Sequence, residues 1–103
     1  MKGLNDLVRQ AQIMQKKMSK LQEELATKTV EASSGGGMVT VVTYGDNRVA
    51  SIKIDQSVVD PSDVSMLEDL IMSAVNESLK KAKEMSQNEL SSLTGGLQIP
   101  GMF

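Results

Sequence analysis

The chain has 103 residues, which is enough for one domain, and only two of them, Tyr44 and Phe103, are aromatic. It contains no Cys and no His, so disulfides, thiol catalysis, histidine proton transfer and most zinc sites are excluded. The formal net charge is −2, and no apolar run approaches the roughly 20 residues that a membrane span needs, so we expect an untargeted cytoplasmic protein with no membrane partner.

Charge is divided unevenly along the chain. The first 29 residues carry six cations against three carboxylates, a net charge of +3. Residues 30–103 carry five cations against ten carboxylates, a net charge of −5. We therefore expect a single domain, 1–103, in which a basic helical arm at 1–29 adjoins an acidic body at 30–103. Such an asymmetry is typical of a segment that binds polyanions.

A long helix is predicted from Leu4 to about Thr27, because no Gly or Pro interrupts this stretch. Its a and d heptad positions are all apolar: Leu4, Leu7, Ala11, Met14, Met18, Leu21 and Leu25. We call these residues the seam; a seam this narrow is typical of paired helices. The helix would be about 36 Å long, so part of it should project from so small a domain. The seam would either pair with the first helix of a second copy or lie along that copy's body.

The cations of this helix lie on the side opposite the seam. Lys2, Arg9 and Lys16 occupy the outward f positions, Lys20 lies one turn beyond Lys16, and Lys17 flanks them. A solvated face is the simpler explanation for any one of these lysines, with Lys20 paired to a nearby glutamate at helical spacing. As a set, the candidates for phosphate contact are Arg9, Lys16, Lys17 and Lys20.

Three short strands are predicted next, at Thr29–Ser33, Val39–Tyr44 and Arg48–Ile54, because β-branched residues alternate between Gly-rich turns. They form an antiparallel meander, which needs a helix packed on it to be stable. The middle strand has apolar residues or Thr on both faces, so both faces should be at least partly covered. The Gly35–Gly37 run precedes a strand rather than a helix, which makes it a hairpin turn and not a phosphate loop.

A second helix is predicted to begin with Asp60 as its cap and Pro61 at its first position. Apolar residues then repeat at helical spacing to Ala82, a further short helical stretch is expected near 85–93, and Thr94-Gly95-Gly96 ends it. An apolar tail, 97–103, follows. The fold class is therefore α+β, in the order α-β-β-β-α, and the scarcity of aromatic side chains in the core favours self-association.

No catalytic, metal or cofactor site is expected. The adjacent carboxylates Glu68 and Asp69 diverge by about 100° on a helix, so they cannot converge as an acid–base pair. Nor does the chain contain a helix-turn-helix spacing, a zinc finger or aromatic residues for stacking on bases. If the protein binds nucleic acid, the backbone of a duplex is the expected target.

Several ordered motifs resemble the YbaB/EbfC family of bacterial nucleoid-associated proteins. They are the Gly35–Gly37 run before a Val-rich strand, Ile52-Lys53-Ile54-Asp55, the stretch from Asp60 to Ile71 continuing through Ala74-Val75-Asn76-Glu77, and the ending Leu93 to Phe103. The resemblance implies a tweezer-like homodimer with projecting first helices. It also implies nucleoid DNA binding with little sequence preference, serving chromosome organisation, gene regulation or recombination and repair.

A protein-interaction adaptor is the alternative function. In that case the seam, the Met-rich surface of the first helix and the apolar tail would receive a replication or recombination protein. The negative net charge favours this alternative, because it opposes long-range attraction to DNA.

Overall fold

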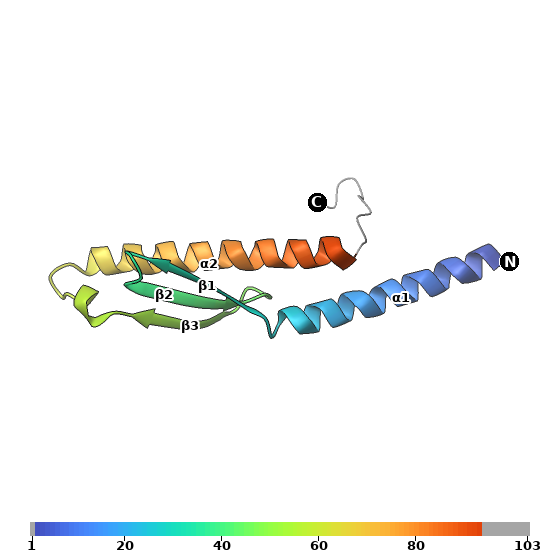
Figure 1. The fold of residues 1–103 in the computed structure, drawn as a ribbon, viewed down its shortest axis with the longest axis horizontal. Coiled ribbons are helices and arrows are strands. Elements are labelled where there is room, and N and C mark those ends of the chain that lie inside the picture. The colour runs from blue at the N-terminus through green and yellow to red at the C-terminus, as the bar shows by residue number, and fades with distance from the viewer. Residues whose placement is uncertain (1, 94–103) are drawn as a thin grey trace.

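A computed structural model describes residues 2–93, apart from the side chain of Lys2. Met1 and residues 94–103, with the predicted stop signal and apolar tail, lie outside the described residues. The elements are α1 (Lys2–Leu25), β1 (Thr29–Ser34), β2 (Val39–Tyr44), β3 (Val49–Ile54), the short 3-10 helix η1 (Gln56–Val58) and α2 (Val64–Leu93). The predicted order α-β-β-β-α is confirmed. The molecule is elongated, 73 × 24 × 16 Å, because α1 extends away from the body formed by the sheet and α2 (Figure 1).

The three strands form an antiparallel sheet in the order β1-β2-β3, as the meander prediction requires. Gly35, Gly36 and Gly37 connect β1 to β2 with φ values of 59°, 68° and 96°, a region that favours glycine. A Cβ on Gly35 would also lie 2.9 Å from Leu70 Cδ2. The glycines are therefore explained by the hairpin and its close approach to α2.

The core lies between α2 and the first two strands. Val39, Val41 and Ala74 are fully buried, and half-buried apolar residues of α2 pack around them. Beside this cluster the hydroxyls of Thr43 and Ser78, both fully buried, are hydrogen-bonded at 2.7 Å. The other face of β2 is half-buried, so the expectation for both of its faces is confirmed.

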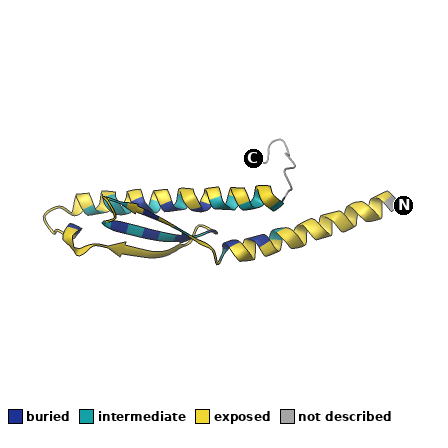
Figure 2. Cartoon of the chain, viewed as in Figure 1, coloured by how far each residue is buried: buried dark blue, intermediate teal, exposed yellow. Residues whose placement is uncertain are grey.

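β3 is exposed at all six positions, although its residues continue the buried face of β2 (Figure 2). Ile52 lies opposite Val41 and Ile54 opposite Val39, so both isoleucines share the face that α2 covers on the neighbouring strands. A register shift between Val42 and Thr43 pairs Thr43 with Val49 instead of Ala50. The alternation of side chains between the two faces of the sheet is therefore interrupted at this end of β3. The edge strand of the sheet, β3, therefore has an apolar face that α2 does not cover.

The predicted start of the second helix is wrong. Asp60 accepts hydrogen bonds from the backbone and hydroxyl of Ser62 and holds a turn, and these bonds lower the pKa of its carboxyl. α2 begins at Val64, three residues after the predicted first position, and Asp63 Oδ1 accepts from the amide of Met66 at 3.2 Å. The further helical stretch expected near 85–93 is confirmed as helix, but it is the end of α2, which runs unbroken for 30 residues. No Gly or Pro interrupts it, and its apolar residues remain in phase with the sheet.

Replacing Asp63 tests this cap. Asp63→Ala is expected to lower the free energy of unfolding by about 1 kcal/mol, because the Met66 amide loses its acceptor at the helix N-terminus. Urea unfolding followed by circular dichroism, at one protein concentration, measures the change. Asp63→Asn keeps an acceptor oxygen and should cost much less; equal losses for the two variants would contradict capping by this side chain.

α1 touches the body only through its last turns. Leu21 and Leu25 are buried, Met18 is half-buried, and residues 3–17 are exposed (Figure 2). The prediction that the helix projects is therefore confirmed. Neither helix, within residues 2–93, is long and apolar enough to cross a bilayer.

Candidate nucleic-acid interface

Three cations lie in a row along the side of α1 opposite its seam. At 100° per residue, Arg9, Lys16 and Lys20 fall within about 40° of one another around the helix axis. They border one shallow depression of the α1 surface, together with Gln12, Ile13, Gln15, Ser19 and Glu23. Along the axis, Lys16 lies about 10 Å from Arg9 and about 6 Å from Lys20. We call these three residues the basic face.

Lys17 belongs to a different side of α1. It borders a groove between α1 and the C-terminal end of α2, where the carboxylates of Glu24 and Glu89 also lie. Lys20 reaches both surfaces. The structure therefore brings together three of the four candidate residues and places the fourth beside acidic groups.

All four candidate cations are exposed. Among residues 2–93, none of them forms a hydrogen bond or an ion pair, so the expected pairing of Lys20 with a glutamate is not formed. Two other lysines, by contrast, have partners. Lys28 forms an ion pair with Glu89, and the hydrogen bond between them raises the pKa of Lys28. Lys81 Nζ donates to the Glu31 carbonyl at 3.0 Å. The basic face is therefore free to meet an external anion.

The chemistry available on α1 suits phosphate oxygens. Guanidinium and ammonium groups donate charge-assisted hydrogen bonds, and the neighbouring Gln12, Gln15 and Ser19 add neutral donors. α1 carries no aromatic residue that could stack on a base. Among the described residues there is also no group of three side chains able to hold a metal ion.

The charge pattern in the sequence did not single out three further exposed cations on the body, Lys53, Lys80 and Lys83. Lys80 and Lys83 lie within α2, which continues ten residues beyond Lys83. They share the outer surface of α2 with carboxylates such as Glu77 and Glu84, so they do not form a basic face. Arg48, in the turn before β3, contacts the end of α1, and no sequence signal indicated this contact.

Two apolar surfaces accompany the basic face. The outer part of the seam is exposed at Leu4, Leu7 and Met14. The second is the uncovered face of β3, where the exposed Ile52 and Ile54 lie side by side with the buried face of β2. Exposed apolar residues gathered in this way mark a site of protein association.

The whole chain has recognisable relatives. A family model described as the YbaB/EbfC DNA-binding family matches residues 1–97. A nucleoid-associated protein of Acetivibrio thermocellus is 58% identical over 102 residues, covering 98% of this chain and 90% of the relative. A nucleoid-associated protein of Syntrophobacter fumaroxidans is 52% identical over 101 residues, with 98% and 91% covered. The crystal structure of an uncharacterized protein from Helicobacter pylori is similar with a TM-score of 0.77 and 29% identity, covering 86% of this chain and 94% of that one.

Proposed function

The chain belongs to the YbaB/EbfC DNA-binding family, and on that premise we propose that it is a nucleoid-associated protein that binds duplex DNA through the basic face of α1. Arg9, Lys16 and Lys20 contact backbone phosphates, and Lys17 makes a weaker, flanking contact. Phosphate contacts position a protein on DNA but carry no sequence information. Binding is therefore of low sequence specificity.

The observation that carries this proposal is the free, one-sided row of cations on a projecting helix. The body is acidic and would be repelled by DNA at close range, whereas α1 extends the basic face beyond it (Figure 1). The two parts thus have different roles within one domain, 1–103: residues 1–29 form the DNA-binding arm, and residues 30–103 form the body.

The body associates with a second copy through the apolar surface around β3. Ile52 and Ile54 continue the core of the sheet but have no helix above them. A twofold partner would cover this face, which adds the burial that an aromatic-poor core lacks. The homodimer then presents two basic faces, as tweezer-like arms, to one duplex.

The relatives named nucleoid-associated proteins support a location on the bacterial nucleoid, in the cytoplasm. A dimer with two low-specificity arms is suited to chromosome organisation, gene regulation or recombination and repair. These processes share the same substrate, the duplex backbone, so the geometry of α1 does not distinguish among them.

A salt titration tests the proposed function. Fluorescence anisotropy with an arbitrary-sequence duplex should give an association constant that falls steeply with salt, with a log–log slope of about −0.9 for each phosphate neutralised. Two unrelated duplex sequences should give nearly equal values. The absence of binding at low salt, or a flat salt dependence, would reject the proposal.

The exposed seam supports a second candidate function, that of an adaptor for replication or recombination proteins. Leu4, Leu7 and Met14 form an apolar stripe to which a partner helix could pack. The two functions use opposite sides of α1. Seam substitutions that abolish capture of such a protein, but leave the salt titration unchanged, would favour the adaptor.

A further inference from the structure

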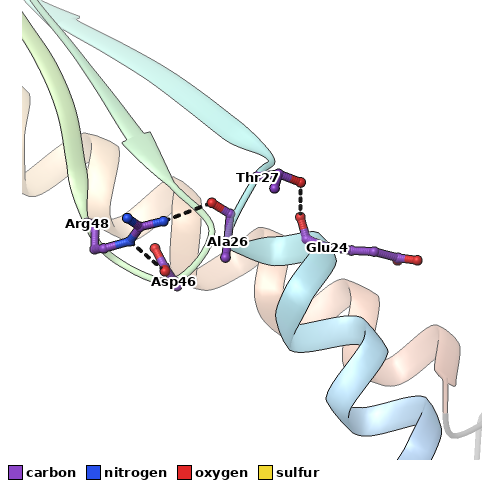
Figure 3. A network of polar contacts seen from close by, with 5 residues as sticks. All are labelled: Glu24, Ala26, Thr27, Asp46 and Arg48. Carbon is purple, nitrogen blue, oxygen red and sulfur yellow. Dashed lines mark hydrogen bonds and ion pairs between the residues drawn. The ribbon is translucent and has the colours of Figure 1, made fainter.

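We propose that Arg48 is a positioning residue that sets the direction of α1 relative to the body, and that it thereby controls DNA affinity without touching DNA. The inference rests on the proposed function of α1. It is drawn from a polar network in which the turn between β2 and β3 holds the end of α1 (Figure 3).

α1 depends on this junction for its direction. Leu21 and Leu25 are its only buried side chains among those described, so nothing along the outer turns fixes where the helix points. Arg9 lies about 25 Å along the helix from Ala26, so a change of about 10° at the junction would move Arg9 by about 4 Å. A displacement of that size is larger than the range of a hydrogen bond to a phosphate.

Arg48 bonds to both sides of the junction. Its Nη2 donates to the Ala26 carbonyl at 2.9 Å, and its Nε donates to Asp46 Oδ2 at 2.7 Å. Its guanidinium also lies 4.7 Å from the centroid of the Tyr44 ring. Because the Arg48 side chain remains 60% exposed, these contacts add little to the free energy of unfolding. Their effect is instead on the direction of α1 relative to the body.

Among residues 2–93, the Ala26 carbonyl accepts no hydrogen bond other than the one from Arg48. The Glu24 carbonyl accepts from the amides of Thr27 and Lys28 and from the Thr27 hydroxyl, which completes the last turn (Figure 3). Ala26 lies just beyond α1, and its carbonyl has no such local partner in the helix. A cation placed there also interacts favourably with the negative end of the helix dipole.

The backbone of the same turn lies close against the junction. The amide of Gly45 donates to the Lys28 carbonyl at 2.9 Å, and a Cβ on Gly45 would lie 2.7 Å from the Leu25 carbonyl oxygen. Arg48 itself closes the turn, because its carbonyl accepts from the Tyr44 amide at 2.8 Å. The guanidinium is planar and its donors have fixed directions, so it can bond to Ala26 and Asp46 together. A lysine has the same charge but lacks this pair of rigid donors.

Arg48→Lys and Arg48→Gln are therefore both expected to widen the range of α1 directions. If α1 points correctly only a tenth to a fifth of the time, the apparent dissociation constant for duplex DNA rises about five- to tenfold. The number of phosphates neutralised in the complex stays the same, so the salt slope should not change. A direct phosphate contact would instead make that slope shallower by up to about 1.8 for Arg48→Gln in the dimer, which has two copies of Arg48.

Two measurements on the full chain test the inference. Because the protein has no Cys, Gln10→Cys on α1 and Glu77→Cys on α2 introduce two exposed sites for spin labels, and diluting labelled with unlabelled protein isolates pairs within one chain. Pulsed electron paramagnetic resonance without DNA then gives the distribution of distances between α1 and the body. DNA affinity and its salt slope are measured on the same variants without the labels.

The inference is supported if both Arg48 variants broaden the distance distribution and weaken binding with an unchanged salt slope. Lys53→Gln, which removes an exposed cation from the neighbouring strand, is the matched control and should leave the distribution as in the original protein. Unchanged distributions in the Arg48 variants, wild-type affinity of Arg48→Lys, or a reduced salt slope would each overturn it. Failure of the unaltered protein to bind DNA would reject the proposed function alone, because the distances are measured without DNA and still decide the role of Arg48.

Discussion

Replacing Arg9, Lys16 and Lys20 together by Gln is expected to lower the affinity for an arbitrary duplex by at least about 100-fold at low salt, because each removed cation is a lost phosphate contact on both arms of the dimer. The log–log salt slope should become shallower by up to about 5 for the dimer. Fluorescence anisotropy across a salt series measures both quantities. Lys17→Gln alone should have a smaller effect, since Lys17 lies on the side of α1 that faces Glu24 and Glu89.

A matched variant separates the basic face from net charge. Lys53, Lys80 and Lys83 are exposed body residues, and replacing all three by Gln removes the same number of charges per chain. This body variant should retain most of the affinity. If it loses as much as the α1 variant, general attraction between the protein and DNA would account for binding, and the assignment of the interface to α1 would be wrong.

Ile52→Glu is expected to convert the proposed homodimer into a monomer. The substitution places a charge on the β3 face that continues the core, and covering that charge with a partner would cost several kcal/mol. Sedimentation equilibrium should show the mass falling to the 11.1 kDa of one chain, and DNA affinity should fall with it, because each particle then has one arm.

Ser51→Glu is the control for this variant. Ser51 immediately precedes Ile52 in the same strand, is exposed, and points to the opposite face of the sheet. It adds the same charge and should remain dimeric. A monomeric original protein, or dissociation by both substitutions, would contradict association through the apolar face of β3.

The elements could be predicted wherever a residue pattern repeats. The seam predicted α1, and the β-branched runs between the glycine turns predicted the three strands and their order. The start of α2 could not be predicted in the same way, because Asp60 and Asp63 are both suitable caps. The choice depends on Ser62, which bonds to Asp60 and closes a turn, leaving Asp63 as the cap.

The candidate site was predictable in part. The alignment of Arg9, Lys16 and Lys20 follows from helical periodicity alone. The environment of Lys17 does not, because it depends on Glu89, which is far away in the sequence and approaches through the packing of α2 against α1. Arg48 was missed for the same reason, since 22 residues separate it from the carbonyl that it contacts.

The isolation of α1 has a consequence for how the protein melts. A helical segment of about 15 residues without tertiary contacts is marginal in water, so residues 3–17 should open and close independently of the body. Their amide hydrogens exchange with solvent at rates set by a local helix–coil equilibrium, and heating frays the arm gradually before the body unfolds in one cooperative step. DNA binding is then coupled to helix formation, so part of the favourable free energy of the phosphate contacts offsets the cost of keeping α1 helical. DNA affinity should consequently weaken on warming even while the contacts themselves stay the same.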